Sequence, residues 1–153
     1  MKYVNIIGRK IFMLYWAIMK PLNLGVRVIV IYKNEVLLVK HTYVKGYYFP
    51  GGGVSKSELF ETAAKRELFE EVGITAHDLS LFGVYQSVKE KKYTTNAVFI
   101  VTLPKRPTLV IQKSELRDAQ FFSTKNLPKD ISPGTRRRIA EYLEGRAPLA
   151  SEW

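Results

Sequence analysis

The chain has 153 residues, of which 46% are hydrophobic and 12% aromatic, so it can bury the core of one domain and is too apolar to be disordered. It contains no cysteine, which excludes disulfides, thiolate metal sites and a cysteine nucleophile, and fits a cytoplasmic protein. Its formal net charge of +10 indicates attraction to polyphosphates, nucleic acid or an anionic membrane, and does not choose among them.

Residues 1–22 are predicted to form a separate amphipathic helical segment. Four apolar residues recur there at helical spacing and form one stripe: Ile7, Ile11, Leu14 and Ile18. The uninterrupted apolar run is far shorter than the roughly 20 residues that cross a bilayer, and Lys20-Pro21 stands where an export signal needs small residues. We therefore expect neither a membrane span nor export. The stripe can pack on its own domain, on a second copy of the chain in a homodimer, or peripherally on a membrane surface.

A strand hairpin is predicted after Pro21. Residues 24–32 are β-branched and nearly all apolar, as in a buried strand, and residues 35–40 form the returning strand after a tight turn at Lys33-Asn34. A polar loop, residues 41–46, leads on toward three consecutive glycines, residues 51–53. Glycines permit close backbone approaches that side chains would block.

A helix with an acidic face is predicted between these glycines and Gly73, which should end it. Its start is ambiguous, because residues 55–58 match a capping box. Spacings of three and four place Glu67, Glu70 and Glu71 on one face, and we expect Leu68, Phe69 and Val72 on the opposite, buried face. Like charges at this spacing destabilise a helix by about 0.2–0.5 kcal/mol per pair, so a bound cation explains the cluster better than packing does. Carboxylates suit Mg²⁺, with Mn²⁺ as the alternative.

The remaining sequence predicts further strands and a second main helix. Strands are expected at residues 79–88, 96–103 and 119–123, with a short edge strand at 108–112, and a helix at 135–143. Residues 89–93 are interpreted as a solvated hairpin tip, with a phosphate-facing loop as the alternative. Order should end near Pro148.

Strands interleaved with two main helices predict an α/β protein, an α/β/α sandwich with a mixed β-sheet, to which the N-terminal helix is added. We divide the chain into an N-terminal segment of residues 1–22, one domain of residues 23–146 and a tail of residues 147–153.

A resemblance to a known family rests on the segment from Gly52 to Ile74. It reads Gly52, five residues, Glu58, seven residues, Arg66-Glu67-Leu68, one residue, Glu70-Glu71, one residue, Gly73-Ile74. This pattern resembles the complete signature of the Nudix hydrolases, without a departure at any position. The resemblance covers approximately residues 24–145 and implies the α/β/α fold. It also implies hydrolysis of a diphosphate bond in a nucleoside diphosphate joined to another group, by a water that a divalent metal activates.

The same resemblance implies roles for individual residues. Glu67, Glu70, Glu71 and the Gly51 carbonyl are the expected metal ligands. Arg66 is expected to orient the carboxylates with Glu58 as its partner, which is compatible with an ordinary salt bridge to Glu70. The family takes its general base from the helix or from a glutamate outside it, for which Glu115 is the first candidate and Glu90 the second. The remaining candidates are substrate contacts, namely Gly52, Gly53, His41 and Tyr43.

Three functions follow from this interpretation. We favour a cytoplasmic Mg²⁺-dependent pyrophosphatase acting on a free nucleotide derivative. The second is an RNA-directed enzyme of the same chemistry that removes a 5′ polyphosphate or cap, which the basic composition and residues 136–138 support. The third is a catalytically silent module that binds nucleotide or RNA, against which the intact acidic face argues. The sequence does not identify the leaving group.

Overall fold

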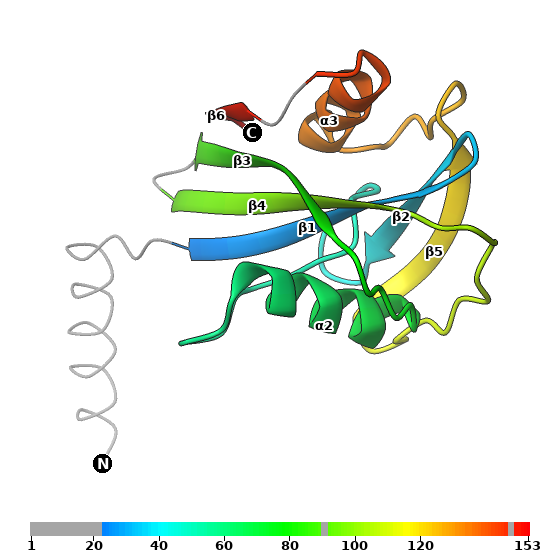
Figure 1. The fold of residues 1–153 in the computed structure, drawn as a ribbon, viewed down its shortest axis with the longest axis horizontal. Coiled ribbons are helices and arrows are strands. Elements are labelled where there is room, and N and C mark those ends of the chain that lie inside the picture. Colours follow the sequence, from blue (N-terminus) through cyan, green and yellow to red (C-terminus); the bar gives the residue numbers. More distant parts are fainter. Residues whose placement is uncertain (1–22, 90–91, 147–148) are drawn as a thin grey trace, which may run out of the picture.

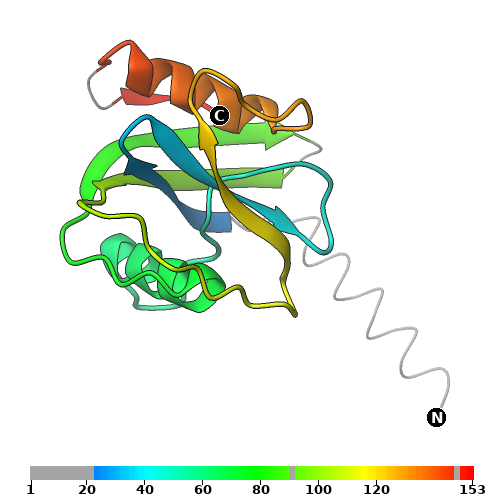
Figure 2. The same ribbon diagram turned by 90° about the vertical axis from the view of Figure 1, so that its right-hand side faces the viewer.

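A single mixed sheet with one helix on each face forms the described part of the chain. The computed structural model describes residues 23–89, 92–146 and 149–153. The strands are β1 (Asn23–Tyr32), β2 (Glu35–His41), β3 (Ser80–Lys89), β4 (Lys92–Thr102), β5 (Leu116–Ser123) and β6 (Leu149–Glu152), and the helices are α2 (Phe60–Val72) and α3 (Pro133–Leu143). Figures 1 and 2 show α2 and α3 on opposite sides of the sheet. The predicted mixed sheet and two main helices are therefore confirmed.

The strand order, β5-β2-β1-β4-β3-β6, places β1 in the interior of the sheet. Strand β1 pairs in parallel with β4 and antiparallel with β2. Alternate residues of β1 therefore enter two cores: Val26, Val28 and Val30 join the core beneath α2, and Ile29 and Ile31 join the core beneath α3. Burial on both faces explains why this strand is apolar almost throughout.

Helix α2 positions the acidic residues, but its buried face differs from the predicted one. Gly73 ends the helix at φ 71°, as predicted, and its N–H bonds to carbonyls of the last turn. The side chain of Phe69 is 59% exposed, so the prediction that it faces the core was wrong. Ala64, Leu68 and Glu71 are all buried and recur at spacings of four and three. Glu71 therefore lies within the core-facing stripe of the helix rather than opposite it.

The helix start also differs from the sequence signal. Leu59 is the N-cap of α2 and makes no capping hydrogen bond with its side chain. The expected capping box at residues 55–58 lies in the preceding turn, where the Ser55 N–H donates to the Glu58 carboxylate. Glu58 is thereby held in the turn, in reach of side chains on the helix.

Residues 108–112 do not form the predicted edge strand. Instead they run beside the end of α2, where the N–H groups of Val110 and Gln112 donate to the carbonyls of Val72 and Glu71 over 3.0 Å each. The last carbonyls of a helix lack partners within it, so this segment satisfies them and fixes the acidic end of α2.

The ends of the other predicted strands also shift. Strand β4 already begins at Lys92, within the predicted hairpin tip, so residues 90–91 alone separate it from β3 and lie outside the described residues. Strand β6 lies beyond Pro148 and pairs in parallel with β3, so the prediction that order ends there was wrong. The predicted N-terminal helix lies outside the described residues. Neither described helix is long and apolar enough to cross a membrane.

Candidate functional site

The glycine turn lies against the centre of the sheet. The N–H groups of Val26 and Val28 donate to the carbonyls of Gly52 and Pro50 over 2.9 Å each, so the turn runs alongside β1. Gly51 has φ 136°, and a side chain there would collide with the Val26 carbonyl. Only glycine therefore fits this position, which brings the Gly51 backbone to the acidic stripe of α2.

Glu71 is the buried carboxylate of the site. Its side chain is 2% exposed, and its Oε2 accepts a hydrogen bond from the Gly51 N–H over 2.9 Å. Burial raises the pKa of Glu71 to about 7, although the Gly51 hydrogen bond and the positive charge of Arg27 act in the opposite direction. The carboxylate is therefore costly to keep ionised without a cation beside it.

His41 packs directly against this carboxylate. It is the last residue of β2 rather than a loop residue, it is 4% exposed, and its Nδ1 lies 3.8 Å from Glu71 Oε1. Burial, together with the charge of Arg27, lowers the pKa of His41 to about 4, so the imidazole is neutral at physiological pH. Within the described part of the chain, Nδ1 has no hydrogen-bond partner.

Arg66 connects the other carboxylates. It contacts both carboxylate oxygens of Glu58, over 2.8 and 2.9 Å, and it also reaches Glu67 over 2.8 Å and Glu70 over 3.2 Å. The paired contact holds the pKa of Glu58 at about 2. Arg66 thus makes both the expected contact with Glu58 and the ordinary helical salt bridge with Glu70.

Glu67 is held close to the glycine turn. Any Cβ placed on Gly52 would come within 2.6 Å of the Glu67 carboxyl carbon, so the absence of a side chain there makes room for this carboxylate. The adjacent Gly53 carbonyl accepts a hydrogen bond from Arg66 over 3.0 Å. The glycine turn and helix α2 are therefore in contact at two places, Gly52 against Glu67 and Gly53 against Arg66.

Arg27 belongs to this cluster, although it lies outside the motif that predicted the site. It lies between Val26 and Val28 on β1, and its Nη1 donates to the Gly51 carbonyl, the same oxygen that was expected to bind metal. Burial lowers the pKa of Arg27, while the charges of Glu71 and Glu67 raise it. A single arginine within an apolar strand needs an acidic partner when it is buried. The position of Arg27 within residues 24–32 was therefore the sequence signal that could have identified it.

The donor chemistry of this cluster fits a hard divalent cation. Three carboxylates of α2 and the backbone oxygens of the turn are ligands of the type that Mg²⁺ prefers, and the charge of Glu67 raises the pKa of Glu71. Among the described residues, no three His, Cys, Asp or Glu side chains lie close enough together to bind one metal ion in their present positions. Arg66 and the Gly51 N–H engage the carboxylates instead.

The remaining predicted residues lie at the margin or elsewhere. Glu115 is exposed in the turn before β5, and its charge contributes to the raised pKa of Glu71. Tyr43 is 75% exposed, and its ring centre lies 5.1 Å from that of His41. Glu90 lies outside the described residues. Residues 136–138 are on α3, on the face of the sheet opposite α2, so they are not part of this site.

Comparison with known proteins assigns the chain to the family that its sequence resembles. Residues 21–142 match the model of the NUDIX domain. The NAD-capped RNA hydrolase NudC of Haemophilus influenzae (strain PittEE) is 34% identical over 122 residues, which are 72% of this chain and 44% of that protein. The ADP-ribose pyrophosphatase of Methanocaldococcus jannaschii is 31% identical over 115 residues, which are 72% of this chain and 66% of that protein. This chain thus spans less than half the length of the NudC relative.

A solved structure reproduces the fold. The MutT NUDIX hydrolase from Burkholderia pseudomallei superposes with a TM-score of 0.71 at 20% identity, covering 78% of this chain and 97% of that one.

Proposed function

Because this chain belongs to the Nudix hydrolase family, we propose that it is a divalent-metal-dependent pyrophosphohydrolase. Its proposed substrate is a nucleoside diphosphate joined to another group, and the bond cleaved is the one between the two phosphates. The observation that carries the proposal is the buried Glu71 carboxylate, held against the Gly51 turn with Glu67 beside it. Burying an acid whose pKa is raised to about 7 costs stability at neutral pH, which supports a functional role for Glu71.

The residues of the cluster divide into ligands and positioning groups. Glu67, Glu70, Glu71 and the Gly51 carbonyl would hold Mg²⁺, with Mn²⁺ as the alternative. When bound, such an ion neutralises phosphate charge and lowers the pKa of a coordinated water. Arg66, fixed by Glu58, positions the carboxylates of Glu67 and Glu70. Arg27, which donates to the Gly51 carbonyl, supplies a cation beside the turn that would contact a phosphate oxygen of the substrate.

Glu115 is our proposed general base. It is exposed to water and lies near enough to Glu71 for its charge to influence the pKa of that carboxylate. A base at the margin of the cluster can take a proton from a water approaching the substrate without also binding the metal. Tyr43 and the neutral His41 would line the path by which the substrate reaches this centre.

An RNA-directed enzyme of the same chemistry is the second candidate. The NudC relative acts on NAD-capped RNA by its name, and the net charge of +10 favours a polyanionic substrate. A silent nucleotide-binding module is the third candidate, and the retained acidic cluster speaks against it. The two enzyme candidates differ in salt dependence, because binding to RNA neutralises many phosphates and weakens steeply as salt rises.

A substrate panel tests the proposal. Purified protein is incubated with Mg²⁺ and a series of nucleoside diphosphate derivatives, capped RNA and triphosphorylated RNA, and the released phosphate is measured after coupling to a phosphatase. We expect turnover of at least one substrate and its loss in EDTA. Turnover of none by a folded protein would exclude both enzyme candidates and leave the binding module.

A further inference from the structure

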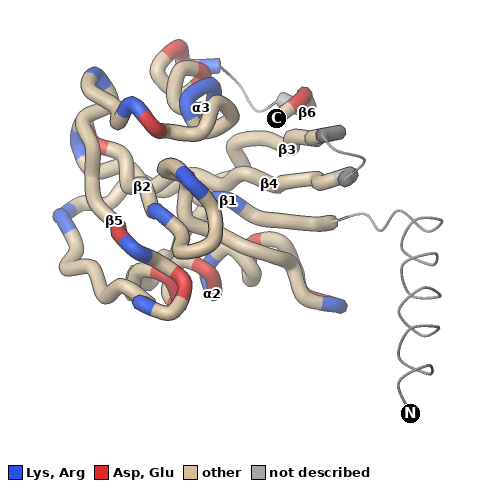
Figure 3. The backbone as a smooth tube through the Cα atoms, turned by 180° about the vertical axis from the view of Figure 1, so that it is seen from behind, with Lys and Arg blue, Asp and Glu red and all other residues tan. Residues whose placement is uncertain are grey.

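A basic pocket adjoins the acidic cluster, and none of the proposed metal ligands lines it. It has a volume of about 560 Å³, within the range of about 300–1,000 Å³ that is usual for ligand sites. Three cationic side chains and one carboxylate line it: Lys40, Lys45, Arg117 and Asp130. Figure 3 shows basic segments on and around β2 and β5, near the acidic segments of α2.

An irregularity in the sheet exposes Arg117 to this pocket. The register of β2 and β5 shifts between Lys40, which pairs with Asp118, and His41, which pairs with Leu116, so Arg117 is the extra residue of a bulge. Regular alternation would place Arg117 on the same face as Ala119 and Phe121, which are buried beneath α2. Because of the bulge, Leu116 occupies this buried position instead, and the guanidinium of Arg117 is exposed.

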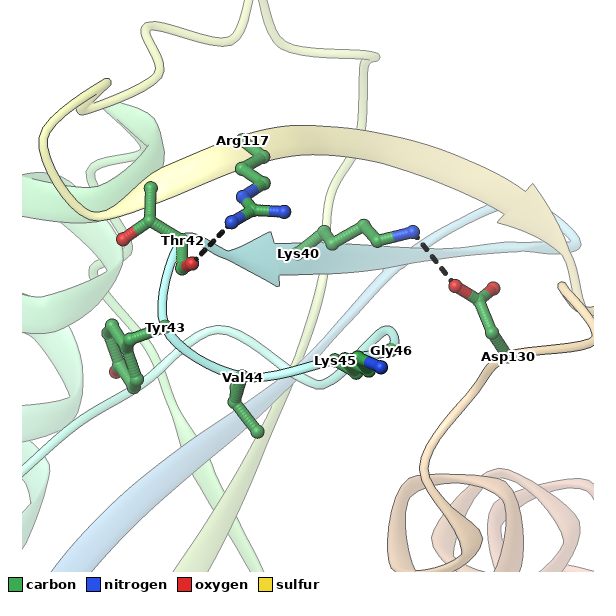
Figure 4. Close-up of a pocket in the computed structure, with 8 residues that line it drawn as sticks. All are labelled: Lys40, Thr42, Tyr43, Val44, Lys45, Gly46, Arg117 and Asp130. Atoms are coloured by element: carbon green, nitrogen blue, oxygen red, sulfur yellow. Dashed lines mark hydrogen bonds and ion pairs between the residues drawn. The ribbon is translucent and has the colours of Figure 1, made fainter.

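The walls of the pocket are fixed by the backbone. Arg117 Nη2 donates to the Thr42 carbonyl over 2.7 Å, and the Thr42 N–H donates to the Glu115 carbonyl over 2.8 Å. Gly46 has φ 96°, and a side chain there would collide with the Asp130 carbonyl. Figure 4 shows the Arg117 contact that holds the Thr42 end of the loop, and at the other end the Tyr47 N–H donates to the Asp130 carbonyl over 3.1 Å, so the pocket is formed before any ligand arrives.

The cations of the pocket keep hydrogen-bonding capacity for an anion. Arg117 uses one of its five N–H donors on the Thr42 carbonyl, and Lys45 is exposed on the loop. Lys40 extends from β2 to Asp130 over 2.8 Å, as Figure 4 shows, and this pair fixes its ammonium group at the pocket wall. With three positive groups against one negative group, the pocket is suited to an anion such as phosphate.

Tyr43 joins the pocket to the acidic cluster. It lines the pocket, its ring centre lies 5.1 Å from that of His41, and His41 Nδ1 lies 3.8 Å from Glu71 Oε1. A molecule whose diphosphate lies at Glu71 can therefore extend past the exposed Tyr43 ring, on which a base could stack, into the basic pocket.

We propose that the pocket formed by Lys40, Lys45 and Arg117 binds a further phosphate group of the substrate, one that is not part of the cleaved diphosphate. The proposal rests on the proposed function, since it places the diphosphate at Glu71. Two sources share this chemistry. The phosphate belongs either to the next phosphodiester of an RNA chain or to the ribose of a small nucleotide.

Two ligand pairs separate these sources. ADP-ribose is compared with ADP-ribose 2′-phosphate, and ATP with a triphosphorylated hexaribonucleotide that begins with adenosine. Dissociation constants are measured by calorimetry on the full chain, with Ca²⁺ in place of Mg²⁺ to suppress turnover. We expect the additional phosphate to tighten binding about tenfold in at least one pair, the gain expected from a charge-assisted hydrogen bond.

Three glutamine variants test which residues cause the tighter binding of the ligand with the additional phosphate. Arg117→Gln and Lys45→Gln should each remove most of that gain, with at most about a twofold loss for the partner lacking the phosphate. Lys125→Gln, which removes an exposed charge outside the pocket, should retain the gain and controls for net charge. A preference in the ADP-ribose pair identifies a small nucleotide, and one in the ATP pair alone identifies RNA.

The proposal is overturned if neither pair shows a preference, if no probe binds, or if Lys125→Gln reduces the preference as much as Arg117→Gln does. Its failure is distinct from failure of the proposed function. Mg²⁺-dependent turnover without a phosphate preference rejects only the pocket assignment, and a preference without turnover supports the pocket and rejects the enzyme.

Discussion

Replacing Glu71 with glutamine should make the metal-free protein more stable and remove its response to metal. Glutamine has nearly the same shape, and its side-chain oxygen can still accept the hydrogen bond that Gly51 donates over 2.9 Å. What the variant loses is the negative charge of a side chain that is 2% exposed. The experiment therefore separates the cost of burying that charge from its proposed use.

The magnitude follows from the pKa of Glu71, which rises from 4.5 to about 7 on folding. The folded state holds the proton more tightly, so the contribution of Glu71 to stability is fully present below pH 4.5 and is lost as the pH rises through about 7. A shift of this size corresponds to about 3 kcal/mol at about 1.4 kcal/mol per pH unit. Without metal, Glu71→Gln should match the wild type near pH 4.5 and exceed it by up to about 3 kcal/mol at pH 8.5.

The pKa of His41 shifts in the opposite direction to that of Glu71, so its effect on stability must be separated from the effect of Glu71. Its pKa is lowered from 6.5 to about 4, so its contribution is present above pH 6.5 and is lost as the pH falls through about 4. Both proteins contain His41, so the difference between their stability profiles isolates Glu71, whereas the wild-type profile alone does not.

Urea unfolding in EDTA between pH 4.5 and 8.5 measures that difference, and the series is repeated with Mg²⁺ at pH 8. The wild type should gain stability from Mg²⁺, and the variant should not. Glu61→Gln is the matched control, because Glu61 lies on the same helix and its partly exposed side chain pairs with Lys65. Parallel profiles for wild type and Glu71→Gln, or equal stabilisation of both by Mg²⁺, would refute the reasoning.

Three further predictions concern residues around this centre. Glu115→Gln should lower kcat with little change in Mg²⁺ affinity, and an unchanged acidic limb in its pH–rate profile would argue against Glu115 as the base. Arg27→Met removes a charge that lowers the pKa of Glu71, so an NMR titration of that carboxyl group should shift to higher pH, and a shift to lower pH would contradict the placement of Arg27. Deleting residues 1–20 should expose apolar surface or change the association state and leave the acidic cluster intact, which light scattering and co-sedimentation with anionic vesicles can check. A monomeric full-length protein that ignores vesicles and loses no stability on truncation would remove any docking role for this segment.

The sequence was most informative where chemistry depends on local spacing. Gly73 ends α2, and the Arg66 contact with Glu58 links residues that the motif already places eight positions apart. The apolar strand at residues 24–32 is buried on both faces, as its composition indicates. Such features are set by backbone conformation and by neighbours along the chain.

Features that depend on distant segments were missed. Helical spacing groups the three glutamates, but only packing against the glycine turn shows that Glu71 is buried and Phe69 is not. The position of Arg27 opposite Gly51 depends on a contact across 24 residues of sequence. Residues 108–112 have the composition of an edge strand, yet they bond to the end of α2 because its free carbonyls are available there.

Turnover of the substrate panel by wild type and Glu67→Gln, with Mg²⁺ and with EDTA, tests the central claim most directly. We predict Mg²⁺-dependent release of phosphate from at least one nucleoside diphosphate derivative or RNA end. Glu67→Gln should lower that rate by at least about 100-fold while its thermal midpoint without metal does not fall. Turnover by a folded Glu67→Gln variant at close to the wild-type rate, or wild-type turnover that persists in EDTA, would contradict the account.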